Sequence, residues 1–199
     1  MKKLTLAFLM FCLTTTFIQA AGDTALTAFK ARDLAEQSLN AEAKGKLIEI
    51  YGAKNAKTLL PTTWQILFYD PYANQDGRMI KISNGHLVGI TDGYSQMDRM
   101  RMAAYKTEEI IDSKKLKIDS DAAFEVVRKS ALLDKAHVTN VEMRLVKSDK
   151  GNSSPVWYIT LYGENAKDGK VTKYGKATVS ATTGQILKMD IDSKKIRNS

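Results

Sequence analysis

Cysteine is almost absent from this sequence. The 199 residues contain a single one, Cys12, in an apolar stretch near the N-terminus. A chain that loses this stretch has no disulfide framework, no thiol chemistry and no cysteine zinc site. It must then be held together by an ordinary apolar core, which a chain of this length can build as one domain or two small ones.

Long apolar runs are also scarce, and the one present is N-terminal. Lys2 and Lys3 precede the apolar stretch Leu4–Ile18, and the small residue Ala20 follows it. This order is typical of a secretory signal peptide, and the apolar part is too short and too rich in threonine for a membrane span. We predict a signal peptide over residues 1–20 with cleavage after Ala20, and a periplasmic or secreted protein without a membrane span. The alternative is a buried N-terminal helix.

Charge of one sign is only mildly in excess. Cleavage after residue 20 would remove two lysines, which leaves 28 Lys and Arg against 22 Asp and Glu, a net charge of +6. These basic residues are spread along the chain and form no recognition motif, so we expect a solvated surface and no nucleic-acid partner. Attraction to an acidic partner or an anionic surface is the alternative.

Catalytic signatures are missing as well. The chain has two histidines, His86 and His137, both expected at turns, and it has no metallopeptidase, phosphate-loop, serine-hydrolase or EF-hand motif. Asp70, Asp76 and Asp168 fall in predicted loops, where a carboxylate usually serves the turn itself. We therefore predict a non-enzymatic protein with no catalytic residue, no metal site and no cofactor.

Methionine is the one residue type that suggests a metal. Met97, Met100 and Met102 lie close together, and thioethers suit Cu(I) in an exported protein. On a helix, however, Met97 and Met100 share a face while Met102 points elsewhere. Core packing by an adaptable side chain is the favoured interpretation.

Two parts of the chain follow the same order of motifs. Trp64–Tyr69 is followed by an Asp-Gly turn, a strand, the turn Asn84-Gly85 and another strand. Trp157–Tyr162 is followed by an Asp-Gly turn, a strand, the turn Thr183-Gly184 and a final strand. The paired Trp-x-Ile-x-apolar-Tyr pattern favours an internal duplication.

Each of these meanders is preceded by a predicted helix and an alternating strand. Apolar residues recur at helical spacing from Ala28 to Leu39, with Thr24 as a cap, and again after Ser120 and Asp121. The segment 141–145 then alternates apolar and charged residues, as a half-buried strand does.

The spacing divides the chain into segments. We predict a first repeat over 21–93, a connecting helix and linker over 94–117, a second repeat over 118–191 and a polar tail over 192–199. Within the connector, Ser95 is expected to cap a helix whose apolar stripe includes Met97 and Met100.

The second repeat resembles the PepSY domain over about residues 118–191. The residues that carry the resemblance are Val156–Tyr162, the turn Asp168-Gly169 and the segment Ala177–Leu187, although Ser180 stands where the family commonly has an acidic residue. The resemblance implies a fold like that of the β-lactamase-inhibitor protein, in which a helical segment crosses a four-stranded antiparallel sheet. It also implies a role in inhibiting or regulating peptidases, without catalytic residues.

These observations predict an α+β fold of two similar PepSY-like repeats, each a helical segment packed on a roughly four-stranded antiparallel sheet. Tyr69, Tyr158 and Tyr162 are expected on the sheet face opposite the tryptophans, and tyrosine is enriched at binding hot spots. We predict an exported protein that binds another exported protein, such as a peptidase, and inhibits or regulates it. The alternative is a periplasmic carrier of a small ligand or metal.

Overall fold

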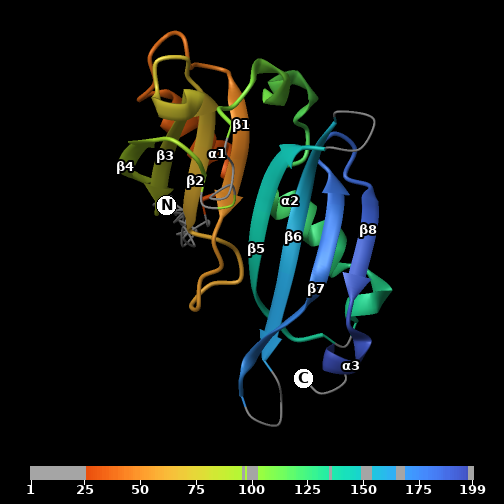
Figure 1. The fold of residues 1–199 in the computed structure, drawn as a ribbon. Helices are drawn as coiled ribbons and strands as arrows, with labels where there is room; N and C mark the ends of the chain where they lie inside the picture. The colour runs from red at the N-terminus through yellow and green to blue at the C-terminus, as the bar shows by residue number, and fades with distance from the viewer. Residues whose placement is uncertain are drawn as a thin grey trace, which may run out of the picture.

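The computed structural model describes residues 26–95, 97, 103–134, 136–148, 154–164 and 169–196. Its elements are drawn in Figure 1 and run in the order α1 (Ala28–Glu36), β1 (Leu47–Gly52), β2 (Thr63–Tyr69), η1 (Asn74–Asp76), β3 (Gly77–Ser83), β4 (His86–Asp92), η3 (Thr107–Glu109), η4 (Ser113–Lys115), α2 (Ser120–Arg128), η5 (Ala131–Leu133), β5 (Val138–Lys147), β6 (Pro155–Glu164), β7 (Val171–Ser180), β8 (Ile186–Ile191) and α3 (Ser193–Ile196). None of the described helices is long and apolar enough to cross a membrane.

The eight strands form a single antiparallel sheet in the order β4-β3-β2-β1-β5-β6-β7-β8. The prediction of two repeats, each with its own four-stranded sheet, is therefore wrong. The strands β1 and β5 pair with each other, with Glu49–Gly52 opposite Met143–Val146. Alternation along a strand shows which of its faces is buried, but the backbone of an edge strand can pair with any other edge. The sequence pattern therefore did not reveal that these two edges join.

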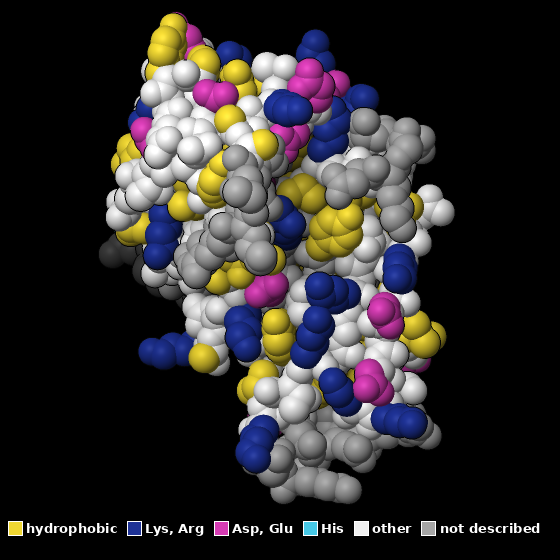
Figure 2. Space-filling view, in the orientation of Figure 1, with side chains coloured by type: hydrophobic (Ala, Val, Ile, Leu, Met, Phe, Trp, Pro, Cys, Tyr) yellow, Lys and Arg dark blue, Asp and Glu magenta, His cyan; other side chains and the backbone are white. Residues whose placement is uncertain are grey.

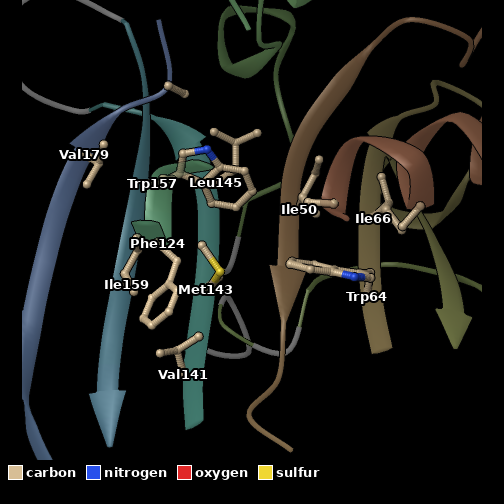
Figure 3. Packing of buried hydrophobic residues seen from close by; sticks show 14 of the residues in the cluster. Ile50, Trp64, Ile66, Phe124, Val141, Met143, Leu145, Trp157, Ile159 and Val179 are labelled. Atoms are coloured by element: carbon tan, nitrogen blue, oxygen red, sulfur yellow. The ribbon is translucent and has the colours of Figure 1, made fainter. Parts of the chain in front are cut away.

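One hydrophobic core runs along the face of the sheet that α1 and α2 cover. Figure 3 shows side chains from β1, β2, β5, β6, β7 and α2 meeting in this core. The rings of Phe29 on α1 and Trp157 on β6 stack with centroids 6.4 Å apart. The predicted inward faces of the two tryptophan strands are confirmed, because both tryptophans and the alternate residues that follow them are buried in this cluster.

Each tryptophan also fixes the approach to a helix. The indole N–H of Trp64 donates to the carbonyl of Leu26, ahead of α1, and that of Trp157 donates to the carbonyl of Ile118, ahead of α2. Both bonds are 2.8 Å long. A buried indole N–H that lacked such a partner would carry a desolvation cost, so these bonds stabilise the packing of helix on sheet.

The hairpin turn predicted from the Asn-Gly pair is present in the structure. Asn84 and Gly85 adopt φ values of 47° and 81° in the turn between β3 and β4. Consecutive positive φ angles define the tight hairpin turn that an Asn-Gly pair favours, so this predicted hairpin is confirmed.

The predicted connecting helix is wrong in the described part of the connector. Residues 103–106 are not helical, and the short 3₁₀ turns η3 and η4 follow them. Tyr105 and Ile111 are buried, and their backbone N–H groups bond other elements: that of Tyr105 bonds the carbonyl of Gln75 in η1, and that of Ile111 bonds the carbonyl of Leu47 in β1. A continuous helix would have used these N–H groups for its own hydrogen bonds.

Both ends of the described chain differ in detail from the expectation. The N-cap residue of α1 is Thr27, and Thr24 lies outside the described residues. The predicted polar tail contains the helical turn α3, which buries Ile196 in the main core. Residues 1–20, the predicted signal peptide, also lie outside the described residues.

Candidate functional site

The face of the sheet opposite the helices is called here the outer face. Its residues follow from the strand register, in which Tyr51, Arg144, Tyr158, Thr178 and Lys188 form one row across β1, β5, β6, β7 and β8. The next row, across β5 to β8, contains Glu142, Thr160, Lys176 and Asp190. Polar and aromatic side chains therefore dominate this face over β5–β8.

A buried ion pair joins the two central strands on the outer face. Arg144 on β5 donates from Nη2 to Oε2 of Glu49 on β1 at 2.7 Å, and the Glu49 side chain is only 2 % exposed. Ser95 Oγ lies 3.5 Å from the same carboxylate oxygen. Burying a carboxylate costs free energy unless it is paired and hydrogen-bonded. The guanidinium of Arg144 therefore offsets the cost of burying Glu49.

A second polar pair lies beside it on the same strands. Tyr51 donates from its hydroxyl to Oε2 of Glu142 at 3.1 Å. Burial, reinforced by the nearby Glu142 carboxylate, raises the pKa of the Tyr51 phenol far above its ordinary value, and the same two causes raise the pKa of Tyr162. Lys54 Nζ lies 4.3 Å from the ring centroid of Tyr162. Both phenols are therefore neutral at physiological pH, and Tyr51 is a hydrogen-bond donor.

The connector covers the outer face over the first half of the sheet. Tyr105 packs with Ile48 and Leu67 in a second small cluster, against which Tyr69 and Tyr94 are partly buried. Ser95 N–H donates to the Tyr105 hydroxyl at 3.0 Å. This covering leaves Tyr69 half-buried, with Lys46 Nζ 5.6 Å from its ring centroid.

The outer face over β6–β8 carries a groove of about 690 Å³. Tyr158 contributes its ring and is 37 % exposed, and Leu187 at the edge of the sheet is 54 % exposed. The groove is lined by Ser148, Ser154, Val156, Tyr158, Lys176, Thr178, Ser180, Thr183, Gln185, Leu187, Lys188 and Asp190. Figure 2 shows Lys and Arg side chains over this part of the sheet, with fewer acidic ones among them. The groove thus combines an aromatic surface, several hydroxyl groups, two ammonium groups and one carboxylate.

The three tyrosines predicted to bind a partner lie on one face of the sheet but not at one place. Tyr158 lies in the groove, and Tyr162 lies four residues further along β6, beside Glu142. Tyr69 ends β2, four residues beyond Gln65, and Gln65 pairs with Tyr51 in the row of Tyr158. Each neighbouring pair from β2 through β1 and β5 to β6 is antiparallel, so β2 and β6 run in opposite directions. Tyr69 and Tyr162 each lie four residues further along their own strand, and they therefore lie on opposite sides of that row. The groove takes in Tyr158 alone.

The histidines and carboxylates do not gather around the groove. His86 begins β4 and His137 precedes β5, and both are exposed. Among the residues that the structure describes, no group of three or more His, Cys, Asp or Glu side chains is arranged to hold a metal ion. Of the methionine cluster, Met97 is 46 % exposed, and Met100 and Met102 lie outside the described residues.

Asp70 has a structural role that the sequence pattern understated. The side chain is fully buried, accepts hydrogen bonds from Arg78 Nε at 2.8 Å and Asn40 Nδ2 at 3.2 Å, and accepts one from the backbone N–H of Tyr72 at 3.0 Å. Burial alone would raise the pKa of Asp70, but the bonds from Tyr72 and Arg78 outweigh it and hold the pKa below its ordinary value. Asp76 lies in the same loop, and Asp168 lies outside the described residues.

Sequence reasoning missed Glu49, Arg144 and Tyr51. In an alternating strand each of them reads as a solvent-facing residue, and the alternation correctly placed them away from the core. A possible signal was the excess of apolar residues in β1, all of whose residues are buried. A strand buried on both faces belongs in the interior of a sheet, not at an edge.

No family model, curated protein or solved structure gives a significant match to this chain. The resemblance to the PepSY domain therefore stays a prediction from the residues quoted above.

Proposed function

We propose that this chain is a non-enzymatic binding protein and that the groove around Tyr158 on the outer face holds a segment of a partner protein. The observation that carries the proposal is the exposure of Tyr158 in the middle of a sheet face, within a groove of about 690 Å³. Tyrosine loses little conformational freedom on binding and combines apolar area with a polar hydroxyl, which is why it recurs at hot spots.

The surroundings of Tyr158 support this role. Its neighbours across the strands are Arg144 and Thr178, and Arg144 is held by its ion pair with Glu49. A ring that stands between a fixed guanidinium and a threonine on a rigid sheet is pre-organised, which lowers the entropic cost of binding. Lys176 and Lys188 outnumber Asp190 in the lining and favour a partner segment with acidic residues.

The finer form of the proposal is that the partner is an exported protein such as a peptidase, which the chain inhibits by occlusion. It rests on the signal-peptide pattern over residues 1–20 and on the PepSY resemblance. Expression of the full chain in a bacterium, fractionation, and mass spectrometry of the exported product test the first part. A product that starts at Ala21 supports export, and a full-length product confined to the cytoplasm contradicts it.

A photo-crosslinking experiment tests the binding site. A benzophenone amino acid is placed at position 158 and, as a matched control, at position 72, because Tyr72 is 74 % exposed on a loop outside the groove. The partner identified at 158 is then purified, and its affinity is measured for the chain and for Tyr158→Ala and Tyr72→Ala.

Loss of a hot-spot tyrosine costs about 2 kcal/mol, so Tyr158→Ala should weaken binding roughly 30-fold while Tyr72→Ala leaves it unchanged. Equal affinities for the two variants would overturn the proposed site. If the partner is a peptidase, the chain should inhibit it and Tyr158→Ala should not. Binding without inhibition would remove the regulatory form of the proposal and keep the binding site.

The groove also favours a second candidate function, that of a small-ligand carrier. Its volume lies within the range of about 300–1,000 Å³ that small-molecule sites occupy. Native mass spectrometry of the purified chain distinguishes the two functions. A co-purified small molecule that Tyr158→Ala releases would favour the carrier. The metal form of this alternative predicts heat on calorimetric titration with Cu(I), and no heat would remove it.

A further inference from the structure

A β-bulge in β8 turns Leu187 toward the groove. Ile186 and Met189 both pack against the main core, although they lie three residues apart on the strand. A regular strand alternates its side chains between two faces, so residues three apart could not share a face. The pairing of β8 with β7 shifts register at this point, which leaves Leu187 as an extra residue. The bulge therefore directs both Leu187 and Lys188 to the outer face, where both line the groove.

Leu187 and the ring of Tyr158 lie on either side of β7. Tyr158 on β6 pairs with Thr178 on β7. Thr178 in turn pairs with Lys188, the neighbour of Leu187 on β8. Adjacent strands lie about 4.8 Å apart, so the backbones of β6 and β8 are roughly 10 Å apart here, with Thr178 between them. Leu187 and Tyr158 are both exposed, and they flank a space above Thr178 whose apolar sides favour an apolar side chain of a ligand.

The charged residues of the groove lie next to this space. Lys188 follows Leu187 on β8, and Lys176 lies two residues before Thr178 on β7. Because Thr178 pairs with Lys188, the two lysines are diagonal neighbours, with Cβ atoms about 7–8 Å apart. Both ammonium groups can therefore reach one carboxylate placed between them. Asp190, opposite Lys176, is the one carboxylate among the lining residues, so two lysines and one aspartate give the lining a net charge of +1.

We propose that the partner segment carries an apolar side chain that inserts between Tyr158 and Leu187. Two positions away it carries Asp or Glu, whose carboxylate lies between Lys176 and Lys188. This inference rests on the proposed function and states what the partner segment must contain. Thr178 and Lys176 are two residues apart on one face of β7, which is also the spacing of side chains on one face of an extended segment. An extended peptide that lies along β7 can therefore fill both places at once.

The apolar contact and the charged contact contribute differently to binding. Burial of Leu187 against an apolar side chain removes apolar surface from water and so contributes to affinity. Lys176 and Lys188 are exposed, so salt screens their attraction to a carboxylate, which acts mainly on specificity and on the rate of association. Loss of Leu187 should therefore weaken binding more than loss of either lysine.

Selection from a phage-displayed library of random peptides on the immobilised full chain tests the sequence of the segment. The selected peptides should combine an apolar residue with Asp or Glu two positions away. One of them is then synthesised with a fluorescent label, and fluorescence anisotropy gives its dissociation constant for the chain and for each variant. Leu187→Ala should raise that constant roughly tenfold, because apolar burial is lost. Val88→Ala is the matched control and should leave it unchanged, because Val88 is the extra residue of a bulge in β4, is also exposed and lies outside the groove.

The charged contact is tested with the same peptide. Lys188→Gln should weaken binding about threefold and make it less sensitive to salt. Urea midpoints of the variants should match that of the wild-type chain, since the replaced side chains are exposed.

The possible failures can be told apart with Tyr158→Ala. Selected peptides without acidic residues, or equal dissociation constants for Leu187→Ala and Val88→Ala, would overturn the inference, while a loss of binding in Tyr158→Ala would keep the proposed site. A selected peptide that binds Tyr158→Ala as tightly as the wild-type chain would instead count against the proposed function. If no peptide is selected, the inference fails, and the photo-crosslinking at position 158 still decides the proposed function.

Discussion

The backbone N–H of Ala28, at the start of α1, donates a hydrogen bond of 3.0 Å to the hydroxyl of Ser120, the first residue of α2. The next N–H, that of Phe29, donates to the carboxylate of Asp119 at 3.1 Å. Thr27, the local N-cap residue of α1, makes no side-chain capping bond. The first turn of one helix is therefore capped by the beginning of the other, some 90 residues away in the sequence.

This arrangement predicts that Ser120→Ala destabilises the whole molecule. The substitution leaves the buried N–H of Ala28 without its acceptor, so the free energy of unfolding should fall by about 1–2 kcal/mol. Urea unfolding followed by circular dichroism measures the change. Asp121→Ala is the matched control, because the Asp121 side chain bonds only the adjacent backbone N–H in an exposed position. Equal losses in the two variants would contradict the shared cap.

Removal of Arg144 should be among the most costly changes on the outer face. Arg144→Met removes the guanidinium that pairs with the carboxylate of Glu49, whose side chain is 2 % exposed, and the free energy of unfolding should fall by about 3 kcal/mol. Arg144→Lys keeps the charge and should lose less. Arg128→Met removes the partner of Glu125 in an exposed pair and should change the urea midpoint little. A small effect of Arg144→Met would show that the Glu49 carboxylate finds other compensation.

Stability should depend on pH in acid through Asp70. Its pKa is lowered in the folded state, so the stabilising contribution is present above the ordinary pKa of about 4 and is lost as pH falls through the folded-state pKa. Asp70→Asn lacks this contribution at every pH. The difference in melting temperature between the two proteins should be largest near neutral pH and should shrink in acid. Asp33→Asn, at an exposed site, is the control.

Stability should also change in alkaline solution through Tyr51. Burial and the Glu142 carboxylate raise the pKa of its phenol, so its contribution is complete below pH 10 and is lost as pH rises from there toward the folded-state pKa. Absorbance near 295 nm follows the ionisation. Glu142→Gln should lower the pKa of Tyr51, and Tyr51→Phe should remove part of the alkaline loss of stability. An unchanged titration curve in Glu142→Gln would contradict the coupling between these two residues.

The parts of the fold that were predicted correctly depend on neighbours in the sequence. The Asn84-Gly85 turn follows from the freedom of two residues to adopt positive φ. The inward faces of the strands that begin near Trp64 and Trp157 follow from the two-residue period of a strand. In the candidate site, the same period placed Tyr158 on the outer face, but not in a groove.

The wrong predictions concern segments whose structure depends on contacts with residues far away in the sequence. A helical pattern in the connector gave way to the packing of Tyr105 and Ile111 on the sheet. Tyr69, expected on a binding surface, is half-buried because the connector lies over it. Neither outcome can be read from spacing, since both depend on which distant segment packs on that face of the sheet.

By itself the sequence determined the inward faces of the two tryptophan strands and the apolar faces of α1 and α2, because each of these depends on residue type and local period. The alternation expected around Glu49 failed, because a bulge between Leu47 and Glu49 places Ile48 and Ile50 in different clusters. Only the tertiary structure decided that β1 and β5 join into one sheet, that Ser120 caps α1 and that Glu49 is buried against Arg144. These are contacts between residues more than 90 positions apart. Backbone edges and helix ends carry the same hydrogen-bonding groups in every sequence, so their partners are chosen by the packing of the whole chain.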